Sequence, residues 1–151
     1  MRQLARAAGG LCVWGLLTAC NSDIPVPATA EIPSLGLLIT VTRTATHPFL
    51  ARYNLTLKVS AAGGCSASSE LFPDTGGVSR RNLYAGARGL LYVVGQFDVR
   101  VFDPGLCMVS LREFRSLEER MKYLGTFDVG DDRRWRFFSA DVRSEQPFEK
   151  P

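Results

Sequence analysis

Histidine is the scarcest reactive residue of this 151-residue chain, because only His47 is present. A catalytic set of the Ser/His/Asp or Cys/His kind would have to use it. His47 precedes a proline in a segment with the character of a loop, and no nucleophile-elbow motif lies near it, so we do not expect it to be catalytic. One histidine also leaves a zinc site short of ligands, and the sequence predicts neither a bound metal nor a cofactor.

A long apolar run is also missing. The apolar stretch near the start follows Arg2 and Arg6 and extends from about Ala7 to Leu17. Roughly a dozen residues are well short of the ~20 that cross the hydrocarbon core of a bilayer. A positive start, a short apolar segment and small residues after it are the parts of an export signal.

The apolar stretch ends in Leu17-Thr18-Ala19-Cys20, which resembles the lipobox of bacterial lipoproteins. The resemblance covers residues 1–20 and indicates no family for the domain that follows. It implies that residues 1–19 are a signal peptide and that Cys20 is lipidated. Two or three acyl chains on that cysteine would bind the lipid bilayer stably. The alternative is an ordinary secretory signal with a chance cysteine.

The residue after the cysteine influences sorting in that family, where an aspartate tends to retain the protein on the inner membrane. This chain has Asn21 instead. The resemblance therefore implies a location in the cell envelope, at the outer membrane and facing the periplasm.

Strong charge is absent from the expected mature protein. The formal charge of +3 falls by two, to +1, when Arg2 and Arg6 leave with the signal peptide. A net charge this small gives no indication of a nucleic-acid partner. A hydrophobic share of 46% with ordinary charge is typical of a packed domain rather than a disordered chain.

Four cysteines are present, but Cys12 lies in the signal segment and Cys20 is the expected lipid site. Cys65 and Cys107 remain, and an oxidising compartment favours a disulfide between them over two free thiols or a metal pair. The bond would close a loop of 43 residues, counted inclusively from the sequence. In the chain-entropy model such a loop is worth ~4 kcal/mol.

The mature chain is predicted to have two parts. Prolines at 25, 27 and 33 disfavour a helix, so residues 20–33 are predicted to form an extended tether that reaches up to ~40 Å. Residues 34–151 are predicted to form a single β-rich domain.

Alternation of apolar and polar residues predicts strands in that domain. The clearest alternation is in residues 51–60, where the odd-numbered residues from Tyr53 to Val59 are apolar or aromatic. In the run 90–102, Gly95 indicates either a bulge in one strand or the centre of a tight turn. The other strand candidates are 35–43, 107–112 and a final hairpin made of 123–129 and 134–139.

A capping-box pattern at Ser116 predicts one short helix that ends near residue 124. The tail from Asp141 onward is predicted to be frayed. The fold class is therefore all-β and mainly antiparallel. We expect a small sandwich or barrel of about six to eight strands with at most one short helix.

Three aspartates near the final hairpin are candidates for a calcium site, because calcium binds carboxylate oxygens. Asp128, Asp131 and Asp132 lack the regular spacing and the closing glutamate of a calcium loop. Gly130 followed by two aspartates is also ordinary turn chemistry, and a turn is the prediction.

Residues 61–89 are the least regular stretch and are predicted to be a long loop, or two loops, whose base is pinned by Cys65. Aromatic and arginine side chains on adaptable loops are typical of binding hot spots. Phe72 and Tyr84 are therefore predicted to anchor a protein partner, with Arg80 and Arg81 giving charge complementarity. The alternative is that Phe72 and Tyr84 cover the edge of the core.

The sequence thus favours a non-enzymatic function. We expect a membrane-anchored periplasmic lipoprotein that binds another protein, such as an inhibitor or immunity protein against an envelope-active enzyme. One alternative is an accessory or structural lipoprotein of an envelope secretion or assembly machine. The other is a cell-wall or lipid-active enzyme, which would need a cleft lined by carboxylates or by His47. These expectations rest on analogy with a class of proteins.

Overall fold

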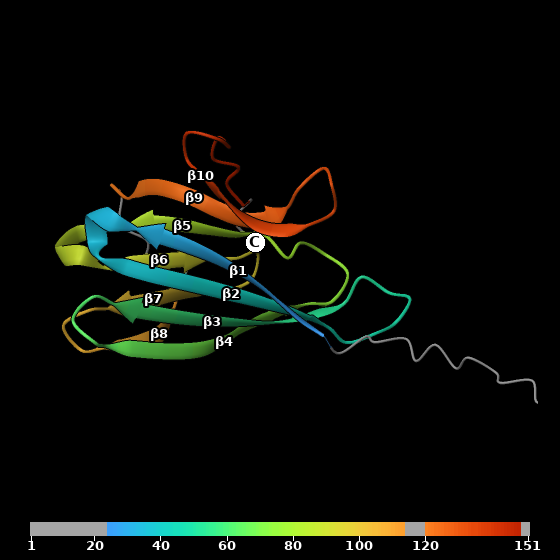
Figure 1. The fold of residues 1–151 in the computed structure, drawn as a ribbon, viewed down its shortest axis with the longest axis horizontal. Coiled ribbons are helices and arrows are strands. Elements are labelled where there is room, and N and C mark those ends of the chain that lie inside the picture. Colours follow the sequence, from blue (N-terminus) through green and yellow to red (C-terminus); the bar gives the residue numbers. More distant parts are fainter. Residues whose placement is uncertain (1–23, 114–119, 149–151) are drawn as a thin grey trace, which may run out of the picture.

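The computed structural model describes residues 24–113 and 120–148, which form a sandwich of two antiparallel sheets (Figure 1). The first sheet has the strand order β1-β2-β3-β4, and the second has the order β10-β9-β5-β6-β7-β8. The strands of the first sheet are β1 (Pro25–Ile32), β2 (Leu37–Ala45), β3 (Tyr53–Ala61) and β4 (Ser66–Asp74). Those of the second are β5 (Arg81–Ala85), β6 (Leu91–Val94), β7 (Val99–Asp103), β8 (Met108–Arg112), β9 (Lys122–Val129) and β10 (Trp135–Ser139). Two short 3-10 turns are η1 (Pro33–Leu35) and η2 (Ala87–Gly89).

The core lies between the two sheets and follows from the alternation in the strands. The inward residues Leu37, Ile39 and Val41 of β2 and Leu55, Leu57 and Val59 of β3 are almost completely buried, and the residues between them lie on the face that is open to water. Opposite them, the second sheet contributes Leu83, Val93, Phe102 and Phe127. Trp135 joins this core, and its indole N–H donates a hydrogen bond to the Val41 carbonyl oxygen of the first sheet (2.9 Å).

The central strands of the second sheet are buried on both faces. The outer face of this sheet carries a second cluster around Tyr84, Tyr92 and Val101, against which Phe148 packs. For this reason β5 and β6 have no exposed face, and their residues are buried or nearly so. The prediction of a frayed tail is wrong for residues 141–148, because this segment covers the sheet. The side-chain amide of Asn82 donates to the Gln146 carbonyl oxygen (3.0 Å).

The strands with clear alternation were predicted correctly. β2, β3 and β8 match the expected positions, and β9 and β10 form the expected hairpin, in which Phe127 pairs with Phe137 and Val129 with Trp135. Residue 95 belongs to a tight turn between β6 and β7, where the Gly95 N–H donates to the Asp98 carbonyl oxygen (2.8 Å).

The predicted tether is wrong over most of its length, because residues 25–32 form β1 and pair with β2 along the whole strand. β1 is an edge strand, so one row of its N–H groups has no partner strand. Pro25 and Pro27 lie two residues apart, and alternate positions on an edge can lack N–H groups without loss of a ladder bond. The folded domain therefore starts at about residue 25 rather than 34.

The predicted long loop over residues 61–89 is also wrong, because this stretch contains β4 and β5. In β4 the inward residues are Ala67, Ser69 and Leu71, and two of these three are small or polar. Pairing with β3 determines the strand despite the weak alternation. These additions raise the number of strands in the described residues above the six to eight expected.

The predicted helix lies partly outside the described residues, which omit 114–119. Where the structure resumes, β9 begins at Lys122, so residues 122–124 are strand and not the end of a helix. In the described part of the chain, no helix has the length and apolar character needed to cross a bilayer.

The predicted disulfide is confirmed. Cys65, just before β4, is bonded to Cys107, just before β8, with the two Cα atoms 5.8 Å apart. Since these strands belong to different sheets, the bond joins the two layers of the sandwich at one end.

Loss of this bond should destabilise the domain strongly. We expect Cys65→Ser and Cys107→Ser each to lower the free energy of unfolding by ~4 kcal/mol, because the bond constrains a long loop of the unfolded chain. Urea unfolding of the protein in detergent measures the change, and a reducing agent should produce the same loss in the wild type. An unchanged midpoint in either variant would contradict the expectation.

Candidate functional site

The two ends of the sandwich carry different loops and turns (Figure 1). We call the end where β1 begins the proximal end; it also holds the β2–β3 loop, the β4–β5 loop, the β6–β7 turn and the β9–β10 turn. The opposite, distal end holds η1, the β3–β4 turn, η2 and the β7–β8 turn.

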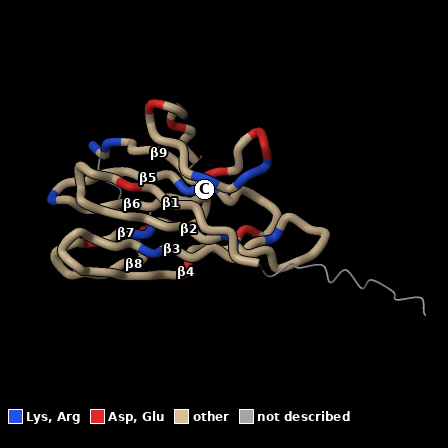
Figure 2. The backbone as a smooth tube through the Cα atoms, in the orientation of Figure 1, with Lys and Arg blue, Asp and Glu red and all other residues tan. Residues whose placement is uncertain are grey.

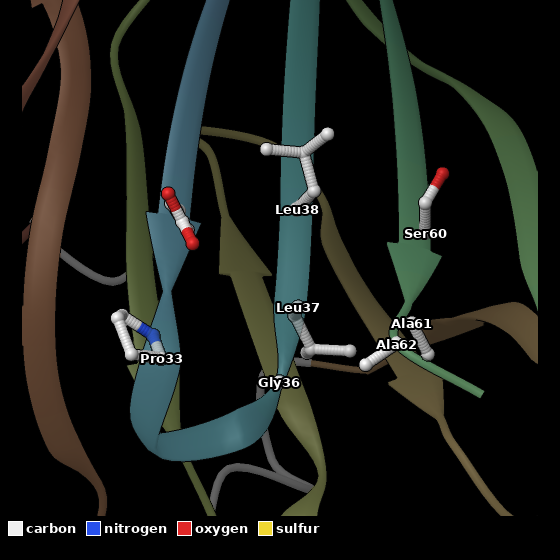
Figure 3. A pocket seen from close by; sticks show the side chains of 8 residues that line it. Pro33, Gly36, Leu37, Leu38, Ser60, Ala61 and Ala62 are labelled. Carbon is white, nitrogen blue, oxygen red and sulfur yellow. The ribbon is translucent and has the colours of Figure 1, made fainter. Parts of the chain in front are cut away.

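The distal end carries an open hollow of about 460 Å³ on the outer side of the first sheet. Glu31, Leu38 and Ser60 form its upper rim, since they are neighbours across β1, β2 and β3. Its lower part comes from the two adjoining turns and the strand ends beside them (Figure 3), and the residues there are Pro33, Gly36, Leu37, Ala61 and Ala62.

Backbone hydrogen bonds between the turns determine the shape of the hollow. The Gly36 N–H donates to the Pro33 carbonyl oxygen (3.1 Å), and the Ala62 N–H donates to the Gly36 carbonyl oxygen (2.9 Å). Gly36 adopts a left-handed conformation, with φ of 61°, that favours glycine. The two turns are thus joined by a hydrogen bond, and the small side chains between them leave a depression in the surface.

The chemistry of the hollow is apolar with one acid. Leu38 is 47% exposed although it lies on an otherwise polar sheet face, and Glu31 is the one charged residue of the lining. Such a surface suits an apolar side chain, or one with an apolar stem and a positive tip.

Arg81, predicted to contact a partner, is instead buried, with only 2% exposed. Its guanidinium donates to the carbonyl oxygens of Phe72 (2.5 Å), Ser79 (3.2 Å) and Arg80 (2.9 Å) and lies 3.8 Å from an Asp98 carboxylate oxygen. Burial lowers the Arg81 pKa, and the nearby charge of Asp98 opposes that effect.

Tyr84 is buried as well, which confirms for this residue the alternative that it covers the core. Its hydroxyl donates to the Glu145 carboxylate (2.9 Å), and its ring centroid is 5.6 Å from that of Tyr123. Burial, and then the bond to Glu145, raise the pKa of Tyr84 well above its usual value.

The four predicted contact residues are therefore not brought together on one exposed loop. Phe72 is 45% exposed on β4 and contacts Phe97, with ring centroids 5.5 Å apart. Arg80 donates to the Gln146 side chain (2.8 Å) and lies over the Phe148 ring. The expectation of a common contact surface is corrected because a strand, and not a loop, contains Arg81 and Tyr84.

His47 organises the β2–β3 loop. Its Nδ1 accepts hydrogen bonds from the backbone N–H groups of Phe49 (3.1 Å) and Leu50 (3.0 Å). Cys20, the predicted lipid site, lies outside the described residues.

The aspartates near the final hairpin serve local structure, as the turn prediction has it. Asp132 accepts from the Arg134 N–H (3.2 Å) and lies 3.3 Å from the Arg136 guanidinium. Asp128 lies 2.9 Å from the Arg143 guanidinium. Over residues 24–113 and 120–148, no three His, Cys, Asp or Glu side chains are grouped as a metal site.

The distal hollow was missed in the sequence because backbone and small side chains from two hairpins form it. The doublet Leu37-Leu38 is the one signal that was available. Since neighbours on a strand face opposite ways, one of two consecutive leucines has to point away from the core.

Comparisons with protein-family models, with curated proteins and with solved structures find no match for this chain. The assignment of a function rests for that reason on the residues and geometry described above.

Removal of the Arg81 charge should destabilise the fold. We expect Arg81→Leu to cost ~3–5 kcal/mol, because it removes one of the two cations beside the buried carboxylate of Asp98, leaving only Arg100, and takes away the donors of several buried carbonyl oxygens. The matched control is Arg134→Leu, whose side chain is 83% exposed, and a change within about 0.5 kcal/mol is expected there. Urea unfolding measures both, and equal small effects would contradict a structural role for Arg81.

Proposed function

We propose that this chain is a lipid-anchored periplasmic protein that binds another protein through the distal end of its sandwich. The observation that carries the proposal is the difference between the two ends. The proximal end lies next to the lipobox in the sequence, and the distal end carries the hollow.

The link between the expected lipid site and the domain is short. Between Cys20 and Ile24 the chain reaches at most about 14 Å, at ~3.5 Å per residue. This is much less than the ~40 Å of a free tether over residues 20–33 at ~3.1 Å per residue. A lipidated Cys20 would hold the proximal end at the bilayer, and a strand as long as β2, about 30 Å at ~3.3 Å per residue, separates that end from the hollow.

The distal surface has the composition of a binding site for protein. Leu38 is flanked by polar neighbours, and an apolar centre with a polar rim is the usual arrangement of an interface. Leu106 and Met108, 68% and 49% exposed, lie in and just after the β7–β8 turn at the same end. Exposed apolar side chains there are available for a partner to cover.

We propose further that the partner is an envelope-active enzyme that this protein inhibits. The rigidity of the distal surface supports this proposal, because the disulfide and the hydrogen-bonded turns hold that surface in one shape. A surface ordered before binding loses little conformational entropy on association, which favours tight inhibition. If the role is inhibition, a soluble form without lipid still inhibits the enzyme.

The lipid anchor is tested by replacing Cys20, the residue whose sulfur would carry the lipid. We expect Cys20→Ala to abolish incorporation of a labelled fatty acid, because the lipidated sulfur is absent. Gel fluorography of cells that express each form measures it, with Cys12→Ala as the matched control that keeps the label. Labelling of the Cys20→Ala protein at the wild-type level would end the lipoprotein assignment.

The distal binding site is tested by a pair of positions on one strand. A photo-cross-linking residue in place of Leu38 should give a discrete adduct in intact cells, whereas the same residue in place of Thr42, on the same face of β2 but outside the hollow, should not. The cross-linked protein is then purified, and its affinity for each variant is measured.

We expect Leu38→Asp to weaken that affinity at least about tenfold, or ~1.4 kcal/mol, because it places a charge where an apolar contact forms. Thr42→Asp is the control and should change affinity less than about threefold. Circular dichroism confirms that both variants fold. Equal affinity of Leu38→Asp and wild type would exclude the hollow as the binding site.

A further inference from the structure

The proximal end gathers most of the exposed apolar side chains of the described residues. Eight of the twelve large hydrophobic residues that are exposed lie there, and the most exposed of all is Phe49, at 84%. The eight are Ile24, Val26, Phe49, Leu50, Phe72, Val78, Phe97 and Leu111.

The β2–β3 loop holds Phe49 and Leu50 outward in a defined conformation. The Thr46 N–H donates to the Arg52 carbonyl oxygen (2.9 Å) and closes the base of the loop. The two bonds to His47 Nδ1 fix the tip, and the His47 and Phe49 rings meet edge to face at 6.2 Å. A loop braced in this way keeps the two apolar side chains away from the core.

The tip is also free of formal charge. From Thr44 to Ala51 no residue is Asp, Glu, Lys or Arg, and the loop is tan beyond its base in Figure 2. The exposed Arg52 follows it, whereas Arg43 on the other side stacks on the Tyr53 ring at 3.6 Å. An apolar tip beside an exposed cation matches a bilayer interface, where apolar groups enter the acyl region and cations meet anionic headgroups.

We propose that Phe49 and Leu50 insert into the interface of the bilayer that carries Cys20. The inference rests on the proposed lipid anchor, because a chain of about 14 Å keeps the start of β1 at the membrane. β1 begins at the end of the sandwich where the β2–β3 loop projects (Figure 1). The anchor makes insertion an intramolecular step, so two side chains suffice where they would not hold a free protein.

Insertion gives the domain a second point of attachment. A single link lets a domain rotate above the membrane, whereas two contacts at one end restrict the rotation. The distal hollow is then turned away from the bilayer and toward the periplasm.

The test uses tryptophan at the loop tip of the mature, lipidated protein in vesicles of phosphatidylethanolamine and phosphatidylglycerol. Phe49→Trp and Leu50→Trp are the reporters. Leu106→Trp is the matched control, because Leu106 is 68% exposed at the distal end. Of the two native tryptophans, Trp14 leaves with the signal peptide and Trp135 is buried, so the wild type gives the background.

Vesicles with brominated acyl chains quench tryptophan that reaches the acyl boundary. After subtraction of the background, we expect the reporters to lose about half of their emission, since interfacial side chains enter ~5–10 Å, while Leu106→Trp stays unquenched. Flotation of the same samples on a density gradient reports the lipid anchor independently.

Each outcome decides the inference. Flotation with quenching of the reporters and not of the control supports it. Flotation without quenching of either reporter overturns insertion and leaves the anchor standing, as for a loop that a protein covers. Flotation with equal quenching at both ends overturns the orientation. Failure of the protein to float overturns the inference together with the anchor.

Discussion

A guanidinium that water cannot reach joins the two sheets at the proximal end. Arg81 begins β5 in the second sheet, and its guanidinium donates to the Phe72 carbonyl oxygen on β4 in the first. Asp98 completes the connection, because its carboxylate accepts the Phe72 N–H (2.9 Å) and lies beside the Arg81 guanidinium. Charges without water need such bonds, since an unpaired buried charge costs several kcal/mol.

The same cluster explains why residue 95 is glycine. A Cβ atom there would lie 2.7 Å from an Asp98 carboxylate oxygen and 2.8 Å from the Arg81 Cζ, which is closer than side chains approach. The β6–β7 turn therefore folds directly over the buried charges. At the distal end the disulfide joins the sheets instead, so the sandwich has an ionic cross-link at one end and a covalent one at the other.

Structural features could be predicted from the sequence where they depend on nearby residues, and could not where they depend on residues far along the chain. β3 was predictable because its own alternation separates a core face from a wet face. β1 was not, because its prolines suggest a free chain unless the reader knows that the strand lies at an edge. Arg81 was assigned to a contact surface because arginine is rarely buried; only the folded chain supplies the Phe72 carbonyl oxygen and the Asp98 carboxylate that make its burial tolerable. The hollow is harder still, since backbone atoms of two hairpins create it.

The position of β1 changes what the domain can do. A free tether would let the sandwich sample any orientation, and then neither end would be favoured for a partner. With residues 25–32 in the sheet, a lipid on Cys20 would act on the proximal end alone. The two ends would then meet different solvents, the membrane interface at the proximal end and water at the distal end, and their surfaces differ in the corresponding sense. Apolar side chains on a braced loop suit the first, and a hollow with a single acid suits contact with a protein in the second.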